Sequence, residues 1–414
     1  MYPLLTGLRV VEGASFIAAP LCGLTFAELG AEVIRFDQIG GGLDFGRWPL
    51  APNGQSLYWE GLNKGKKSVA LDLNRPEGRE LAVAIIAAGG DNAGLFVTNY
   101  PAGGFLSHER LARLRPDLIT LRVTGSSDGS SALDYTINSA AGYPFLTGPV
   151  ENDRPVNHVL PAWDLSCGLT AAVTLLAAER ARRGGAGGGE IRLALSDIAF
   201  STLGNLGQLA EVQVNNAERP KLGNDLYGAF GRDFRTSDGR FVMICAITRK
   251  QWVSLLEALD LVAEVAALEK VLKLDFGADE GKRFEHRSTL YALVEARIQA
   301  LAYPACASLL DKHAVCWGPY RSVRQALEED PRISTANPMF AEVLHPSGMP
   351  YLTPGFPAAF DYIERQSAPT SPRLGQHTEE VLADVLGLSN ARIGELLEKK
   401  LVATVTVADD RRSR

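Results

Sequence analysis

The chain has 414 residues, of which 46% are hydrophobic and 22% are charged, and its net charge is −6. This balance is typical of a globular protein, and the length predicts two domains or one large α/β domain with an appendage. The acidic balance offers no basic surface for nucleic acid. Five cysteines without CxxC pairs indicate neither a disulfide framework nor a zinc site.

The N-terminal segment MYPLLTGLRVVEG lacks the basic stretch, apolar stretch and cleavage site of a secretory signal. No window of the sequence approaches the ~20 apolar residues needed to cross a bilayer. We therefore expect a cytoplasmic protein with no membrane partner.

Strand-like runs alternate with helical patterns through the first part of the chain. Leu8–Glu12 predicts a strand, Pro20–Leu29 a helix, and residues 31–36 a second strand. The alternation continues with helices at 76–88 and 108–116 and with strands at 93–99 and 117–125. Such alternation predicts an α/β fold with a parallel sheet covered by helices on both faces.

A long apolar helix is expected from Asp164 to Arg183, with arginines at its C-terminal end, where the helix dipole favours cations. A strand beginning at Glu190 and a helical stretch over 197–213 follow. A linker is expected at 215–224, where the pattern loosens.

Beyond the linker, residues 231–247 predict a hairpin around the turn Ser237–Gly239. Amphipathic helices follow to about Leu327, which makes a smaller α+β unit. The last part is rich in proline and glycine and turns helical at Thr378, as expected for a strap that returns to the first domain.

Several common catalytic and cofactor motifs are missing. The glycines of Gly184–Gly189 are not followed by the Lys-Ser/Thr of a phosphate-binding loop, so they predict a flexible turn. The first strand-to-helix turn lacks GxGxxG, which argues against a dinucleotide cofactor. The histidines have no metal spacing, and neither Ser166 nor Ser196 lies in a GxSxG elbow. No tightly bound cofactor and no metal are therefore expected.

Asp164, in PAWDLSCG, lies near the start of the long apolar helix. An aspartate at this position is ordinarily an N-cap, and the residues alone favour this interpretation. The same position suits a nucleophile, because helix N-terminal amides stabilise an ionised carboxylate. The two roles are compatible.

Segments spread over nearly the whole chain resemble the family III CoA-transferases. These segments are GLRVVEGASFIAAPLCGLTFAELGAEVIRFD, NKGKKSVALDLNRPEGREL, VTNYPAG, DYTINSAAGYPFLTG, WDLSCGL and PRLGQHTEEVLADVLGLS. The segments NHVLPAWD, GNDLYGAFGRDF, NPMF and GGGLDFGRWP resemble a branch that moves CoA between the two carboxyl groups of one diacid.

The resemblance implies a Rossmann-like large domain formed by both chain ends, residues 1–215 and 331–414. It also implies a small α+β domain over 225–327 and an interlocked homodimer. Coenzyme A enters as part of the substrate, an acyl-CoA thioester of a small dicarboxylic acid.

The resemblance also assigns roles to individual residues. The family's nucleophile corresponds to Asp164. The CoA contacts correspond to Ile17, Ala18, Gln38, Leu71 to Asn74, Asn99, Tyr100, Asp134 and Tyr135. The sequence departs from the family pattern at Gln38 and Asn74, where basic residues are frequent, and at Pro101, where arginine is frequent.

Two further departures from the family pattern restrict the activities that we expect. The glycine flap of formyl-CoA transferases is absent between Asn215 and Ile244, and GNDLYGAFG stands there, with Tyr227 and Gly228 as expected substrate contacts. Leu133 occupies the position of the racemase histidine, and leucine cannot exchange a proton.

These observations predict transfer of CoA within one diacid through an aspartyl anhydride and an aspartyl-CoA thioester at Asp164. Backbone amides near Asp164 and around Gly228 are expected to stabilise the oxyanions. Two alternatives stay open at this point. One is an intermolecular CoA-transferase acting between two acids, and the other is a CoA-binding protein without catalysis.

Overall fold

The computed structural model describes residues 1–405 and divides into two compact units. Unit 1 comprises Met1–Ala141, Val159–Ala210 and the chain from Asp330, and unit 2 comprises Gly142–His158 and Glu211–Glu329. The division expected from sequence placed residues 142–158 in the large domain, whereas their contacts group them with unit 2. One physical reason is Lys221, whose Nζ donates to the carbonyls of Asn152 and Arg154 at 2.8 and 2.7 Å.

Unit 1 is built on a seven-stranded sheet in the order β12-β3-β2-β1-β4-β5-β6. Its neighbouring strands pair in parallel, except that β12 runs antiparallel to β3. The expected α/β fold with a parallel-dominated sheet is thereby confirmed. The strands are β1 (Arg9–Gly13), β2 (Glu32–Gln38), β3 (Lys67–Leu71), β4 (Leu95–Thr98), β5 (Ile119–Thr124), β6 (Gly189–Ala194) and β12 (Val402–Ala403).

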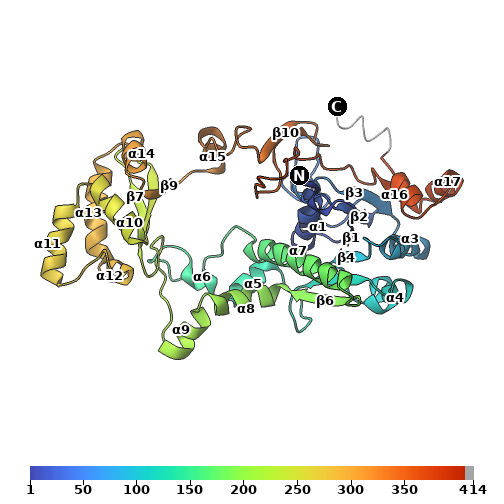
Figure 1. Ribbon diagram of the computed structural model, residues 1–414, viewed down its shortest axis with the longest axis horizontal. Coiled ribbons are helices and arrows are strands. Elements are labelled where there is room, and N and C mark those ends of the chain that lie inside the picture. The colour runs from blue at the N-terminus through green and yellow to red at the C-terminus, as the bar shows by residue number, and fades with distance from the viewer. Residues whose placement is uncertain (406–414) are drawn as a thin grey trace. The chain divides into compact units, whose positions relative to one another are not determined.

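Helices cover both faces of this sheet (Figure 1). On one face, α3, α4, α16 and α17 share a buried core with strand residues such as Phe36 and Phe96. On the other face, α1 packs against α7. The helices of unit 1 are η1 (Pro3–Leu5), α1 (Ala18–Glu28), α2 (Leu57–Asn63), α3 (Pro76–Ala87), η2 (Gly104–Leu106), α4 (His108–Leu114), α5 (Asp134–Ala140), α7 (Ala162–Arg183), α8 (Leu195–Asn205), α16 (Thr378–Asp384) and α17 (Asn390–Glu398).

The helical stretch expected over 197–213 is two helices in the structure, α8 and α9 (Gln208–Asn215). The break falls at Gly207, whose φ of 74° lies in the left-handed region that glycine adopts without steric cost. Unit 1 also carries a two-stranded ribbon of β10 (Phe340–Leu344) and β11 (Pro350–Pro354). No helix within residues 1–405 is long and apolar enough to cross a membrane.

Unit 2 contains a three-stranded antiparallel sheet in the order β7-β8-β9. The hairpin expected over 231–247 is confirmed, and Gly239 at its turn has a φ of 85°. Aromatic side chains of Phe230, Trp252 and Tyr291 fill the core between sheet and helices. The elements are α6 (Tyr143–Leu146), β7 (Phe230–Arg235), β8 (Phe241–Ala246), α10 (Arg249–Ala258), α11 (Val262–Leu272), α12 (Glu280–Glu285), α13 (Arg287–Gln299), α14 (Tyr303–Lys312), β9 (Cys316–Pro319) and α15 (Val323–Glu329).

Candidate active site

The strand order of unit 1 reverses between β1 and β4, and parallel α/β sheets bind ligands at the carboxyl edge beside such a reversal. The loops that leave these two strands are tied together there. Asn99 accepts a hydrogen bond from the Ser15 amide at 3.1 Å and donates one to the Ser15 carbonyl at 2.7 Å. Asn99, one of the residues assigned to CoA by resemblance, therefore joins the loops that follow β1 and β4.

The other residues assigned to CoA in unit 1 follow the carboxyl ends of strands or begin the neighbouring helices. Gln38 ends β2, and its side chain accepts a hydrogen bond from the Leu73 amide at 2.8 Å. Asn74 is exposed, and its amide donates to Asp72. Burial, with the nearby Asp37 carboxylate, raises the pKa of Tyr100 to about 12. Ile17 and Ala18 begin α1, Leu71 ends β3, and Tyr135 is exposed in α5.

Asp164 lies in the first turn of α7, but it is not the N-cap that the sequence favoured. The helix begins at Ala162 and its N-cap is Pro161, which has no side chain able to accept a hydrogen bond. A carboxylate from another helix takes over this role. Asp134 Oδ2 accepts the backbone N–H groups of Trp163 at 2.7 Å and of Asp164 at 3.1 Å. The Asp164 carboxylate is therefore left free of the capping role.

The environment of Asp164 changes its acidity. Burial, with a smaller contribution from the charge of Asp134, raises the pKa of the Asp164 carboxyl to about 6, while the positive charge of Arg47 opposes this rise. Asp134 itself is buried, and its Oδ1 has no hydrogen-bond partner within residues 1–405. A half-buried carboxylate with a raised pKa retains basicity, which suits a nucleophile in acyl transfer.

One helical turn after Asp164, Gly168 lets α7 approach the first turn of α1. A Cβ atom at Gly168 would lie 2.7 Å from the Ala18 carbonyl oxygen, so only glycine allows this contact. Residues four apart share one face of a helix. The face of α7 that carries Asp164 therefore packs against the first turn of α1, which follows Phe16.

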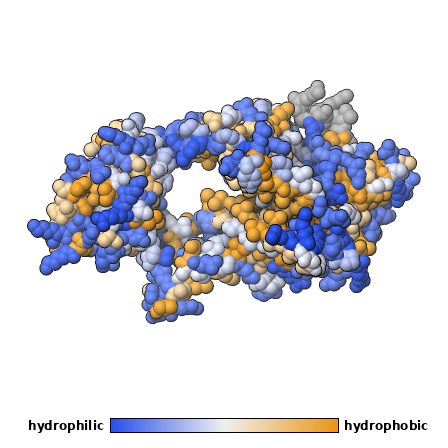
Figure 2. Space-filling model, in the orientation of Figure 1, coloured by the Kyte–Doolittle hydropathy of each residue, from blue (hydrophilic) through white to orange (hydrophobic). Residues whose placement is uncertain are grey.

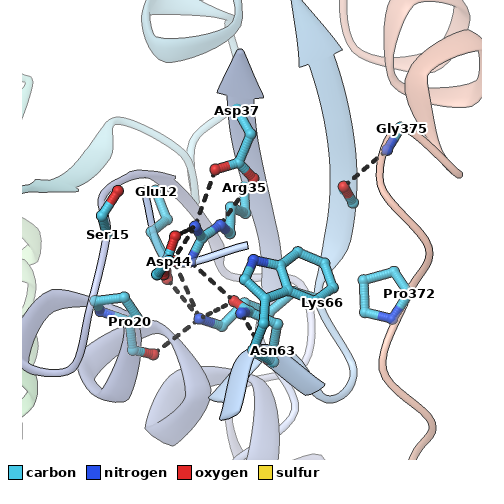
Figure 3. Close-up of polar contacts among 12 residues, drawn as sticks. Glu12, Ser15, Pro20, Arg35, Asp37, Asp44, Asn63, Lys66, Pro372 and Gly375 are labelled. Atoms are coloured by element: carbon cyan, nitrogen blue, oxygen red, sulfur yellow. Dashed lines mark hydrogen bonds and ion pairs between the residues drawn. The ribbon is translucent and has the colours of Figure 1, made fainter. Parts of the chain in front are cut away.

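Beneath the loop between β1 and α1 lies a buried ion network (Figure 3). Arg35 donates to Asp37 at 2.8 Å and to Asp44 at 3.0 Å, and Lys66 donates to Glu12 at 2.8 Å. Burial raises the pKa of Glu12 and lowers that of Lys66. Every charged group of the network is buried and paired. The network therefore restricts the conformation of the surrounding chain more than it contributes to the free energy of folding.

Asp44 connects this network to the site. While Arg35 holds its Oδ1, its Oδ2 accepts the Phe16 amide at 3.0 Å. Phe16 has a φ of 69°, a backbone conformation that non-glycine residues adopt rarely and that is often found at functional sites. Sequence reasoning did not identify Asp44, Arg47 or Tyr58, although Asp44 and Arg47 stand in GGGLDFGRWP, one of the segments that carried the resemblance.

Tyr227 and Gly228, the expected substrate contacts, lie in unit 2. The Tyr227 hydroxyl donates to Glu211 at 2.8 Å, and the Arg219 guanidinium carbon lies 3.8 Å from the centre of the Tyr227 ring. Gly228 has a φ of 79°. These contacts hold the GNDLYGAFG segment within its own unit, and the role of both residues toward substrate stays a prediction.

A sheet with this strand order defines an α/β protein with a switch point between β1 and β4. The sequence matches the CoA-transferase family III over residues 5–378, and the chain belongs to this family. It is 49% identical, over 97% of this chain and 98% of the relative, to 2-methylfumaryl-CoA isomerase of Chloroflexus aurantiacus.

The chain also matches more distant relatives. The chain is 25% identical to the mouse succinyl-CoA:glutarate CoA-transferase, over 95% of this chain and 89% of that relative. A CAIB/BAIF family protein from Brucella suis of known crystal structure has a TM-score of 0.74 and 26% identity, over 93% of this chain and 100% of the other. The family membership establishes an enzyme that acts on CoA thioesters.

Proposed function

We propose that this enzyme is a 2-methylfumaryl-CoA isomerase, which moves CoA between the C1 and C4 carboxyl groups of one diacid. The observation that carries the proposal is the 49% identity to the Chloroflexus aurantiacus isomerase across nearly the full length of both chains. The raised pKa of the half-buried Asp164 supports it, because a carboxylate of increased basicity suits covalent acyl transfer.

The reaction balances with Asp164 as the only covalent group. An Asp164 oxygen attacks the thioester carbonyl, the C–S bond breaks, and CoA leaves as the thiolate. The thiolate then attacks the Asp164 carbonyl of the anhydride, which releases the diacid and leaves CoA on Asp164 as a thioester. The other carboxylate of the diacid repeats these steps in reverse, and Asp164 is regenerated.

The position of Asp164 in the first turn of α7 supports this chemistry. The first amides of α7 already have partners, since those of Trp163 and Asp164 donate to Asp134 and those of Ala162 and Leu165 donate to backbone carbonyls. The dipole of α7, rather than a free amide, therefore favours the negative charge of the developing oxyanions. Asp134 takes the amides of Trp163 and Asp164, so the Asp164 carboxylate is available to react.

The direct test is to incubate the purified enzyme with the C1 ester of 2-methylfumaryl-CoA and to separate the C1 and C4 esters by liquid chromatography. Conversion without any added acid is expected. Conversion only in the presence of a second acid would favour the intermolecular CoA-transferase, and CoA-ester binding without conversion would favour a non-catalytic binding protein.

We further propose that the chain works as a homodimer. Three apolar residues on one face of α7 are exposed, namely Leu169 at 53%, Val173 at 70% and Leu176 at 37%. Figure 2 shows apolar side chains gathered over this part of unit 1. An exposed apolar face of this kind is typical of an interface with another chain. Sedimentation analysis should give twice the chain mass, and Val173→Glu should shift the distribution toward the monomer.

A further inference from the structure

Arg47 is a cation whose charge acts on Asp164, because it opposes the rise in the pKa of this carboxyl. Its guanidinium carbon lies 5.5 Å from the centre of the Phe16 ring and 5.3 Å from the centre of the Tyr58 ring. Arginine stacked on two aromatic faces is held in place while its N–H groups stay available.

Both ends of the short segment that carries Arg47 are fixed. The Arg47 amide donates to the Asp44 carbonyl at 3.1 Å, and Asp44 is held in turn by Arg35 and by the Phe16 amide. The Arg47 carbonyl accepts the Ser56 hydroxyl at 2.5 Å, and Ser56 is the N-cap of α2, which carries Tyr58. The position of the guanidinium is therefore built into the fold.

Packing contacts connect this guanidinium to the helix that carries Asp164. Phe16 precedes Ala18, whose carbonyl faces Gly168 on the same face of α7 as Asp164. The electrostatic effects agree, since Asp164 also contributes to raising the pKa of Tyr58. Arg47 and Tyr58 are therefore both near enough to Asp164 to be coupled to it electrostatically.

The polar groups at this place have few partners within the protein. Within residues 1–405, Arg47 forms no ion pair with a carboxylate, and the Tyr58 hydroxyl has no partner apart from the Arg47 guanidinium. A cation and a hydroxyl that lie together near a nucleophile fit a planar anion from the ligand.

We propose that Arg47, with the Tyr58 hydroxyl beside it, binds the free carboxylate of the acyl group and so selects thioesters of dicarboxylic acids over those of monocarboxylic acids. This inference rests on the proposed function, because it takes an acyl-CoA as the molecule that reacts at Asp164. It adds the residues that recognise the second carboxylate, which is also the group that must later attack.

The test compares two ligands that differ only in that carboxylate. In (E)-2-methylbut-2-enoyl-CoA, a methyl group replaces the free carboxylate of 2-methylfumaryl-CoA. Binding of both is measured by calorimetry in Asp164→Asn, which blocks the reaction. Arg47→Met in this background should weaken the carboxylated ligand about ten- to a hundredfold, as expected when a charged hydrogen-bond partner is lost. The methyl analogue should change by about twofold or less.

Three further variants sharpen the result. Arg47→Lys should recover part of the preference, because it keeps the charge but not the forked geometry. Tyr58→Phe should lose less than Arg47→Met, because it removes one neutral donor. Arg110→Met removes a surface arginine of α4 that is paired with Glu80 of α3, and it should leave both affinities unchanged. Circular dichroism checks that each variant is folded.

The outcomes separate this inference from the proposed function. An unchanged ratio of the two affinities in Arg47→Met, or equal weakening of both ligands, would overturn the role of Arg47 even if the wild type isomerises its substrate. If the wild type does not isomerise 2-methylfumaryl-CoA, the proposed function fails. The carboxylate preference is then measured with succinyl-CoA against butyryl-CoA in the same variants, and its loss in Arg47→Met still supports the subsite.

Discussion

Asp134 and Asp164 lie thirty positions apart in the chain, yet Asp134 Oδ2 accepts the backbone N–H of Asp164 at 3.1 Å. One carboxylate caps the helix on which the other is presented. The residue that caps α7 is therefore not the nucleophile. Burial raises the pKa of Asp164, and the negative charge of Asp134 raises it further.

Replacing Asp164 should abolish turnover and spare binding. Asp164→Ala and Asp164→Asn should each lower kcat by about a thousandfold or more, because the covalent step loses its nucleophile. CoA-ester affinity should change little, since the expected CoA contacts come from other loops. Hydroxylamine trapping during turnover, followed by mass spectrometry, should modify Asp164 and no other carboxylate. Full activity in Asp164→Ala would refute the assignment.

The pH dependence should follow the ionisation of Asp164. Its folded-state pKa of about 6 lies above the ordinary 3.8, so the carboxyl is protonated and inactive in acid. The value of kcat/KM should therefore rise with pH through about 6 and level off above it, because this quantity reports the free enzyme.

Asp134→Asn tests the coupling between the two carboxyls. Asparagine keeps an oxygen that can accept the Trp163 and Asp164 amides but removes the negative charge. The pKa of Asp164 should fall, and the acidic limb of the pH profile should move to lower pH. The shift should be partial, because burial is the largest cause of the raised pKa. A profile that stays in place with wild-type activity would show that the charge of Asp134 has no part in it.

The enzyme should not exchange the α-proton of 2-methylacyl-CoA substrates with solvent. Leu133 is exposed at the position where the racemase branch has a histidine, and it offers no acid or base. Incubation in deuterated water and mass spectrometry should detect no incorporation. Deuterium uptake at a rate that matches turnover would instead indicate a racemase.

Intramolecular transfer predicts that the diacid does not leave the enzyme between its two covalent steps. Unlabelled 2-methylfumaryl-CoA mixed with free ¹³C-labelled methylfumarate should isomerise without label entering the CoA-ester pool. An acid retained at the site has a high effective concentration, so its reaction with the enzyme-bound CoA is faster than its dissociation. Rapid incorporation of label would favour the ordinary transferase between two acids.

Local pattern was enough to predict most elements of the sheet and the hairpin of unit 2, because strand runs and helical runs differ in period. It failed at the start of α7. The residues around Asp164 are what an N-cap requires, and nothing nearby in sequence reveals that Asp134 supplies the cap from another helix. The position of the Arg47 side chain likewise depends on contacts with Asp44, Ser56 and two aromatic rings. The tertiary structure brings these residues together, so their contacts could not be predicted from local sequence.

The short strand β12 pairs Val402 and Ala403 with Leu71 and Ala70 of β3, so the sheet takes one outer strand from the end of the chain. During synthesis this strand is made last, after all of unit 2. Until then β3 presents open backbone groups, which favour pairing with other chains. Completion of the first two hundred residues is therefore not sufficient to close the sheet. A chain cut short before Val402 should be more prone to aggregate than its small loss of contacts suggests.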